Sequence, residues 1–257
     1  MADAPNAGAT NAFAGSTSGA GGPPRVPAVT VVVPTYNEAL NVETLARRLF
    51  AAVDPAAAEL LIVDDNSPDG TAAVAERLAA ELPVRCLVRR DERGLATAVL
   101  AGLRDSRGDI VVVMDADLSH PPEAVPSLVA ALADPQVEMA LGSRFVAGGH
   151  IDQGWPWHRR MLSWGGRLLA RPLCSVRDLA SGFFAMRRQQ IHFERLAPVG
   201  YKIALELIVR HGWRHVVEVP ITFADRAAGQ TKLTFGEQFR YLRHLARLYA
   251  WVVSGRH

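Results

Sequence analysis

The chain has 257 residues, of which 49% are hydrophobic and 21% charged, a composition that fits one sizeable α/β domain or two small ones. The formal net charge of +2 is too small to favour nucleic acid as a partner, and no run of about 18 apolar residues predicts a membrane span. Cys86 and Cys174 have no metal-ligand spacing, so we expect a reducing, cytoplasmic environment.

Residues 1–26 predict a disordered tail. They are mostly Ala, Gly, Ser, Thr and Pro, and a segment with so little apolar surface cannot offset the entropy of ordering it. The tail also lacks the basic stretch followed by an apolar stretch that marks a secretory signal. We therefore expect a folded domain at 27–233 and an amphipathic helix at 234–257.

Short apolar strands then alternate with segments of helical periodicity. The expected strands are 29–34, 60–65, 84–89, 109–115 and 137–144. The expected helices between them are 40–53, 69–82, 94–106 and 121–134. Because the strands are continuously apolar, the pattern predicts an α/β fold with a mainly parallel central sheet and helices on both faces.

After residue 145 the alternation is less regular. A Gly-rich, aromatic loop is expected at 146–157 and a polar loop at 225–233. The remaining expected elements are helices at 158–173, 201–212 and 236–253 and strands at 181–188 and 214–223.

Four polar segments follow the apolar strands: PTYNE at 34–38, DDNSPDGT at 64–71, DADLSH at 115–120 and GSR at 142–144. Ligands of parallel α/β sheets bind beyond the carboxyl ends of the strands. The four segments are therefore expected to lie along one edge of the sheet and to form a ligand site.

Two carboxylates, one residue apart, follow the strand at 109–115. Side chains at i and i+2 of a strand share a face, so Asp115 and Asp117 should point toward one place, where they repel unless a cation lies between them. Oxygen ligands at this spacing suit Mg²⁺ or Mn²⁺. The alternative is a solvated turn in which Asp117 caps the helix at Pro121, and the pair alone leaves both interpretations open.

The ends of the first two strands offer groups for a nucleotide. The carboxylate of Asp65 can accept the NH groups of a base, Tyr36 can stack on the base, and Glu38 can bind a ribose hydroxyl. The alternatives are a plain turn at 64–71 and a charged first helical turn at Glu38. Neither a G-x-G-x-x-G motif nor a P-loop is present, so a phosphate here is expected to be held by a metal ion and side chains.

In combination and in order, the segments VVVPTYNE, VDDNSPDGT, DADLSHPPE, GSR, SGFFAMRR and PITFADRAAGQTKL resemble those of glycosyltransferase family 2, and within it those of the dolichol-phosphate and polyprenol-phosphate mannose synthases. The resemblance spans residues 28–233. It implies a GT-A (Rossmann-like, nucleotide-sugar-binding) catalytic domain. It also implies inverting transfer of mannose from GDP-mannose to a polyprenyl monophosphate, with Mg²⁺ or Mn²⁺ as the cofactor.

The resemblance also implies roles for single residues. Those implied to bind the nucleotide sugar are Pro34, Tyr36, Glu38, Asp65, Asp115, Ala116, Lys202, Arg226 and Lys232. Those implied to hold the metal ion are Asp115, Asp117 and Ser119, although some relatives have a glutamine where this chain has Ser119, so water is an alternative third ligand. Those implied to act in catalysis and to hold the acceptor phosphate are Asp117, Arg144, Arg159 and Ser163.

A lipid monophosphate is already a dianion near neutral pH, because its second pKa is about 6. No strong general base is therefore needed, and no Ser-His-Asp arrangement is visible. Alternatives within the fold are a UDP-glucose donor or a polymerising enzyme, but the chain lacks the Gln-x-x-Arg-Trp segment of the latter. A third alternative is a catalytically idle subunit that binds a nucleotide sugar.

The helix expected at 236–253 has an apolar stripe, formed by Phe235, Phe239, Leu242, Leu245, Leu248, Tyr249 and Val252. The basic residues expected on the other side are Arg240, Arg243, His244 and Arg247. The stripe either packs on the domain or lies on an anionic bilayer, with Trp155 and Trp157 adding to the same surface. Since the sequence ends at His257 without a membrane helix, we expect a peripheral protein on the cytoplasmic face, held by this helix or by a membrane-anchored partner.

Overall fold

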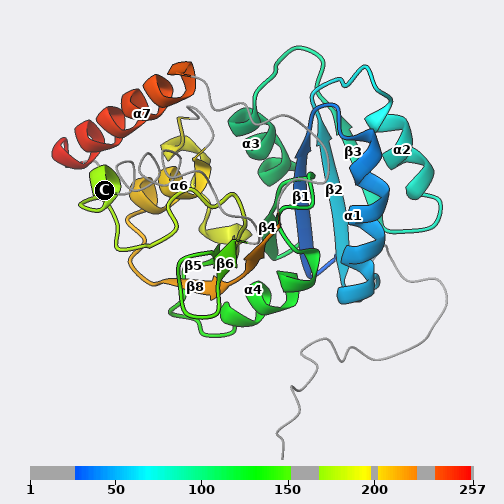
Figure 1. Ribbon diagram of the computed structural model, residues 1–257, viewed down its shortest axis with the longest axis horizontal. Coiled ribbons are helices and arrows are strands. Elements are labelled where there is room, and N and C mark those ends of the chain that lie inside the picture. The colour runs from blue at the N-terminus through cyan, green and yellow to red at the C-terminus, as the bar shows by residue number, and fades with distance from the viewer. Residues whose placement is uncertain (1–26, 152–167, 198–201, 225–234, 256–257) are drawn as a thin grey trace, which may run out of the picture.

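The computed structural model describes residues 27–151, 168–197, 202–224 and 235–255. The expected tail at 1–26 lies outside the described residues, as does most of the helix expected at 158–173, of which 168–170 are helical. Within the described residues, seven strands form one sheet in the order β3-β2-β1-β4-β7-β5-β8, and β6 and β9 pair in a small second sheet (Figure 1).

The predicted strands are confirmed to within a few residues, and one further strand, at His150–Ile151, lies in the segment 146–157 that was expected to be a loop. Their bounds are β1 Val29–Thr35, β2 Ala58–Asp64, β3 Val84–Val88, β4 Ile110–Val113, β5 Met139–Ser143, β6 His150–Ile151, β7 Phe184–Arg187, β8 Val216–Pro220 and β9 Thr222–Phe223. The single strand expected at 214–223 is two strands. Pro220, which has no amide hydrogen to donate, ends β8, and β9 pairs with β6 instead.

The helices also lie where the periodicity predicts them. Their bounds are α1 Ala39–Ala52, α2 Thr71–Leu78, α3 Leu95–Asp105, α4 Val125–Ala131, α6 Ile203–His211 and α7 Phe235–Val253. Short 3₁₀ turns complete the described elements: η1 Pro122–Ala124, η2 Arg188–Gln190 and η3 Phe193–Arg195. The helix expected at 121–134 is thus one 3₁₀ turn followed by α4.

Alternate side chains of the strands face two different layers of helices. Val32 and Leu61 lie in the cluster that includes α3, α6 and α7. Their neighbours Val31 and Leu60 lie in the cluster that includes α1, α2 and α4. The predicted α/β fold with helices on both faces is therefore confirmed (Figure 1).

Strand β7 departs from the parallel arrangement. It runs antiparallel between β4 and β5. By contrast, β1 is parallel to both of its neighbours, β2 and β4, and β5 is parallel to β8. The amino end of β7 therefore lies at the same edge as the carboxyl ends of the other strands. This edge is called the rim below.

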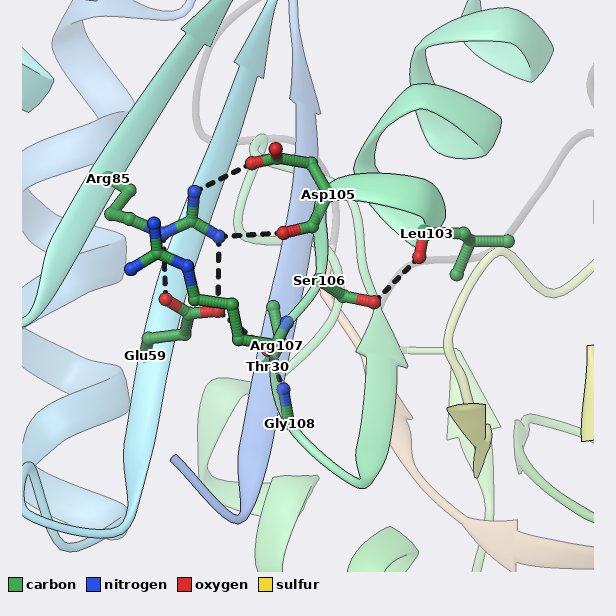
Figure 2. Close-up of polar contacts among 8 residues, drawn as sticks. All are labelled: Thr30, Glu59, Arg85, Leu103, Asp105, Ser106, Arg107 and Gly108. Carbon is green, nitrogen blue, oxygen red and sulfur yellow. Dashed lines mark hydrogen bonds and ion pairs between the residues drawn. The ribbon is translucent and has the colours of Figure 1, made fainter. Parts of the chain in front are cut away.

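At the opposite edge of the sheet a polar network fixes the starts of the strands (Figure 2). Arg85 donates from Nε to Glu59 (2.8 Å) and from Nη1 to Asp105 (2.6 Å), and the hydroxyl of Thr30 donates to Glu59 (2.7 Å). Burial raises the pKa of Glu59, but the hydrogen bonds from Arg85 and Thr30 outweigh it and leave the pKa below its usual value. The amide of Gly108 donates to Thr30 (2.8 Å), so this network joins β1, β2 and β3 to the loop after α3.

Helix α7 packs part of its predicted apolar stripe on the domain, but Leu242 and Val252 of that stripe are exposed. Tyr241, Leu245 and Leu248 are buried in the cluster that contains α6. The position expected for His244 on the outer face is wrong, because its imidazole is buried and lies 3.2 Å from the carboxylate of Glu206 on α6. The side chain of Arg240 lies outside the described residues.

We predict that Leu248→Ala lowers the free energy of unfolding by about 2–5 kcal/mol, because it leaves a cavity at a fully buried position. Leu242→Ala is the matched control on the same helix, since Leu242 is 50% exposed, and it should change stability by less than about 0.5 kcal/mol. Urea unfolding followed by circular dichroism measures both. Equal effects would mean that α7 does not pack on the domain in solution.

Candidate functional site

At the rim, the end of β2 forms a turn built around a buried carboxylate. Asp64 accepts hydrogen bonds from the hydroxyl of Thr35 (3.0 Å) and from the amide (2.8 Å) and hydroxyl (2.5 Å) of Ser67. Its side chain is therefore used by the turn, as the alternative interpretation of this segment expects.

Asp65, the next residue, links the rim to the start of α3. It lies 3.0 Å from a guanidinium nitrogen of Arg89 and accepts a hydrogen bond from the amide of Gly94 (2.7 Å). The loop between β3 and α3 brings the guanidinium of Arg93 over the ring of Tyr36, 4.9 Å from the ring centre, and Arg93 donates to the Tyr36 hydroxyl (3.3 Å). Asp65 and Tyr36 are thus tied to the same loop, and the ring of Tyr36 remains 41% exposed.

Glu38 lies at the start of α1, where its carboxylate accepts a hydrogen bond from Asn41 (2.7 Å). Its amide donates to the hydroxyl of Thr71 (3.0 Å), and Asp69 accepts from the amide of Ala39 (3.0 Å). The starts of α1 and α2 therefore hold each other beside the rim. Glu38 is the N-cap residue of α1, so the alternative that placed it in the first helical turn is wrong by one position.

The expected metal pair follows β4. Asp117 is almost buried and its Oδ1 accepts hydrogen bonds from the amide (3.1 Å) and the hydroxyl (2.5 Å) of Ser119. Leu118 between them has a positive φ of 62°, a strained value for a branched residue. The side chain of Asp115 is 38% exposed, and Ala116 is buried. The turn thus directs one carboxylate into the protein and leaves the other at the surface of the rim.

The buried imidazole of His120 contacts the backbone of Asp115. The amide of Asp115 donates to His120 Nδ1 (3.1 Å), and the imidazole stacks on Phe183 with ring centres 5.3 Å apart. Burial lowers the pKa of His120 most strongly, while Asp115 and Asp117 act in the opposite direction. A neutral imidazole that accepts at Nδ1 fits both observations. The sequence analysis did not select His120, because a lone histidine has no distinctive signal.

The amino end of β7 completes the wall around Asp115. A Cβ added to Gly182 would lie 3.5 Å from both carboxylate oxygens of Asp115 and 3.5 Å from the ring of His120. Glycine therefore leaves the space beside this carboxylate open. The signal in the sequence was the SGFF segment, whose function could be assigned only by resemblance.

Arg144, at the end of β5, forms a buried pair with Asp178. Its Nε and Nη2 each donate to the carboxylate at 2.7 Å, and its amide donates at 3.0 Å. Phe223 lies under the guanidinium, 4.8 Å from ring centre to Cζ. Asp178 could not be predicted from the sequence, because it lies 34 positions from Arg144 in a segment without a strong motif.

Lys202 lies beside the same pair. Burial lowers its pKa to about 8, with Asp178 acting to raise it and Arg144 to lower it further. Its ammonium lies 3.5 Å from the centre of the Tyr241 ring on α7. The C-terminal helix therefore contacts a candidate site residue directly.

The structure thus brings together Asp115, Asp117, Arg144 and Lys202, and it adds His120 and Asp178. Pro34, Tyr36, Glu38 and Asp65 line the neighbouring part of the rim at the ends of β1 and β2. The remaining candidates, Arg159, Ser163, Arg226 and Lys232, lie outside the described residues.

Burial raises the pKa of both cysteine thiols, Cys86 and Cys174, to about 11, as expected of unreactive partly buried thiols.

The donor set at the rim fits a hard divalent cation. Asp115 and Asp117 supply carboxylate oxygens, and Ser119 holds one of them in place. Among the described residues no group of three or more His, Cys, Asp or Glu side chains is arranged to hold a metal ion. An ion bound here would therefore complete its shell with water and phosphate oxygens, as Mg²⁺ commonly does.

The mainly parallel α/β sheet thus carries an acidic pair and a basic group at one rim, where ligands of such sheets bind. The family model for glycosyl transferase family 2 matches residues 30–193. The chain belongs to glycosyltransferase family 2, which confirms the resemblance seen in the sequence motifs.

Among curated proteins, the chain is similar to dolichol-phosphate mannosyltransferases. A dolichol-phosphate mannosyltransferase of Pyrococcus furiosus is 41% identical over 87% of this chain and 64% of its own length. A dolichol-phosphate mannosyltransferase of Saccharomyces cerevisiae is 42% identical over 86% of this chain and 87% of its own. The chain thus spans less than two thirds of the archaeal relative and most of the yeast relative.

Solved structures share the fold. A mannosyltransferase of Pyrobaculum calidifontis, solved in complex with GDP-Man and Mn²⁺, aligns with a TM-score of 0.60 and 22% identity over 90% of this chain and 65% of its own. A mannosyl-3-phosphoglycerate synthase of Rubrobacter xylanophilus aligns with a TM-score of 0.67 and 19% identity over 90% of this chain and 76% of its own. The predicted GT-A fold is confirmed.

We predict that Ser119→Ala weakens Mn²⁺ binding about 10-fold, since supporting partners of a metal-binding carboxylate typically contribute that much. Titration calorimetry with Mn²⁺ in the presence of GDP measures this affinity. Ser106→Ala is the control, because Ser106 is also buried but bonds to the carbonyl of Leu103 at the opposite edge of the sheet (Figure 2). Unchanged Mn²⁺ affinity in Ser119→Ala would show that Asp117 does not need this hydroxyl.

Proposed function

We propose that this protein transfers mannose from GDP-mannose to a polyprenyl monophosphate, with inversion, to give a polyprenyl phosphate β-mannose. The observation that carries the proposal is the meeting of two sets of charges at the rim: the carboxylates of Asp115 and Asp117, and the cations of Arg144 and Lys202. The relatives named as dolichol-phosphate mannosyltransferases support mannose as the sugar and a lipid phosphate as the acceptor. The mannosyltransferase solved in complex with GDP-Man and Mn²⁺ supports the choice of donor.

The donor is assigned to the ends of β1, β2 and β4. Tyr36 offers a partly exposed ring for the base, with Glu38 and Asp65 beside it. Bound to Asp115 and Asp117, Mg²⁺ or Mn²⁺ would supply Lewis-acid stabilisation of the departing diphosphate. The hydroxyl of Ser119 orients Asp117 for this role. Among the described residues, no third His, Cys, Asp or Glu side chain joins Asp115 and Asp117 in a group that could hold a metal ion.

The acceptor phosphate is assigned to Arg144. Lys202, which the resemblance groups with the residues that bind the nucleotide sugar, is assigned to the acceptor as well, because it lies beside Arg144 and Asp178. A phosphate monoester is mostly a dianion at neutral pH, so its oxygen attacks the anomeric carbon without a general base and GDP leaves from the opposite side. Attack from the face opposite the leaving group converts an α-linked donor into a β-linked product. The chain must therefore neutralise two phosphate groups as they approach, and cations at the rim do so. The resemblance implies that Arg159 and Ser163 also hold the acceptor phosphate, and that Arg226 and Lys232 bind the nucleotide sugar.

Two alternatives keep the same fold. A UDP-glucose donor would use the same carboxylates, and an idle subunit would bind a nucleotide sugar without turnover. The acidic pair, its supporting Ser119 and the buried Arg144–Asp178 pair are all in place, which favours an active enzyme over an idle subunit.

We predict that Asp117→Asn lowers turnover by about 100-fold or more, because the metal ion's stabilisation of the leaving diphosphate is worth several kcal/mol. Formation of mannosyl lipid from labelled GDP-mannose and a short polyprenyl phosphate is measured with Mn²⁺ and with excess EDTA. EDTA should abolish turnover of the unchanged protein. Asp54→Asn, an exposed acid away from the rim, is the control. Full turnover of Asp117→Asn at saturating Mn²⁺ would contradict the assignment.

The lipid substrate requires that the protein reach a membrane. In the described parts of the chain, no helix combines the length and apolarity needed to cross one. The outer face of α7 exposes Leu242 together with Arg243 and Arg247, and the exposed Leu168 and Leu169 lie nearby, because the hydroxyl of Tyr249 donates to the carbonyl of Leu169 (2.6 Å). We propose that this mixed apolar and basic surface lies on the cytoplasmic face of an anionic bilayer.

We predict that Arg243→Gln with Arg247→Gln weakens binding to phosphatidylglycerol-containing vesicles about 30-fold, since each basic residue near such a surface contributes about 1 kcal/mol. Flotation at low and high salt measures the binding, which should also fall with salt. Arg77→Gln with Arg188→Gln is the control pair, since both arginines are exposed and neither is on α7. A protein that does not float at low salt would require a membrane-anchored partner instead.

A further inference from the structure

We infer that Asp178 is a positioning residue for the transfer: it holds the guanidinium of Arg144, beside Lys202, in the orientation that receives the acceptor phosphate. This inference rests on the proposed function and extends it to a residue outside the sequence motifs of the site.

The contact between Asp178 and Arg144 leaves little freedom to either side chain. The Asp178 carboxylate is fully buried and accepts from Nε, Nη2 and the amide of Arg144. Because two parallel hydrogen bonds fix a planar guanidinium in both position and rotation, Asp178 determines where the cation of Arg144 lies.

Asp178 is itself fixed to the sheet. Its amide donates to Glu218 (3.0 Å), and the amide of Arg177 donates to the other carboxylate oxygen of Glu218 (2.9 Å). Glu218 lies on β8, opposite Leu141 of β5, and Arg144 follows β5. The two members of the ion pair are therefore held by neighbouring strands.

The negative charge of Asp178 cannot itself attract the acceptor phosphate. A carboxylate beside two cations reduces their net attraction for an incoming phosphate, so a site built only for field strength would omit it. Without it, however, the ammonium of Lys202 and the guanidinium of Arg144 would repel each other in a poorly solvated place. The described charged or titratable groups facing Lys202 include Asp178, Arg144 and Tyr241. We therefore attribute to Asp178 the placement of the Arg144 guanidinium beside Lys202.

The two explanations predict opposite results for Asp178→Asn, which removes the charge and keeps the shape. If Asp178 positions Arg144, the KM for polyprenyl phosphate rises and kcat/KM for the lipid falls about 100-fold, the size expected for a catalytic group misplaced by about 1 Å. If only the field matters, the KM for the lipid falls. The affinity for GDP with Mn²⁺, measured by calorimetry, should change less than twofold.

The pH profile supplies an independent readout. Lys202 must be protonated to bind phosphate, and its pKa of about 8 places a decline of kcat/KM for the lipid as the pH rises through that value. Asp178 acts to raise this pKa. In Asp178→Asn the decline should therefore begin at a lower pH, and a purely structural residue would not move it.

Two further variants keep the test decisive. Glu59→Gln removes a buried carboxylate paired with an arginine at the opposite edge (Figure 2), so it should lower stability without changing the KM for the lipid or the pH profile. If Asp178→Asn does not fold, Glu218→Gln weakens the support of Asp178 and keeps its charge. It should raise the KM for the lipid severalfold and leave the pH profile in place.

An unchanged or lower KM for the lipid in Asp178→Asn would overturn the inference. The same holds for Glu218→Gln where that variant replaces Asp178→Asn. A raised KM for the lipid and a shifted pH profile in the control Glu59→Gln would also overturn it. Failure of the proposed function looks different, because the unchanged protein would then form no mannosyl lipid at all.

Discussion

The reversed direction of β7 is the constraint on which the site depends. Because β7 runs antiparallel between β4 and β5, its amino end reaches the rim where the carboxyl ends of the parallel strands lie. Gly182 then lies against Asp115, and the segment that precedes it brings Asp178 to Arg144. With a parallel strand in this place, the segment before β7 would lie at the opposite edge. The acidic and basic groups would then not share a site.

Buried charges at the two edges of the sheet have different uses. Taking an ion out of water costs several kcal/mol, which a buried pair offsets only with good geometry and further hydrogen bonds. Glu59 and Arg85 meet that condition with Thr30 and Asp105 (Figure 2), and their contacts join strand starts to a loop. Arg144 and Asp178 meet it too, but they lie beside Lys202 and the carboxylates of β4. The first network stabilises the sheet, and the second also holds a cation where a phosphate can approach.

Much of this architecture could be predicted from local patterns. Apolar strands alternating with helical periodicity predict the sheet and its two helical layers, and the position of Asp115 and Asp117 after an apolar strand predicts that they lie at the rim. The i and i+2 spacing does not orient them, because β4 ends at Val113 and a turn with a positive φ at Leu118 follows. What local patterns do not encode is strand direction and long-range pairing. The period of two in the β7 segment is the same in either direction, and the 34 positions between Arg144 and Asp178 leave their contact invisible. The apolar stripe of α7 was visible, but the buried partner Glu206 that draws His244 inward was not. At 64–71, Asp64 forms the turn that its neighbours predict, whereas the contact of Asp65 with Arg89 depends on the fold.

We propose that this rim joins a guanosine diphosphate sugar to a lipid phosphate. The most direct measurement is a competition in which equimolar GDP-mannose and UDP-glucose, Mn²⁺ and a short polyprenyl phosphate in anionic vesicles are mixed with the protein. Mass spectrometry of the extracted lipid then identifies the sugar transferred. The account predicts polyprenyl phosphate carrying mannose and negligible glucose. A glucosylated lipid as the main product, or no glycosylated lipid at all, would contradict it.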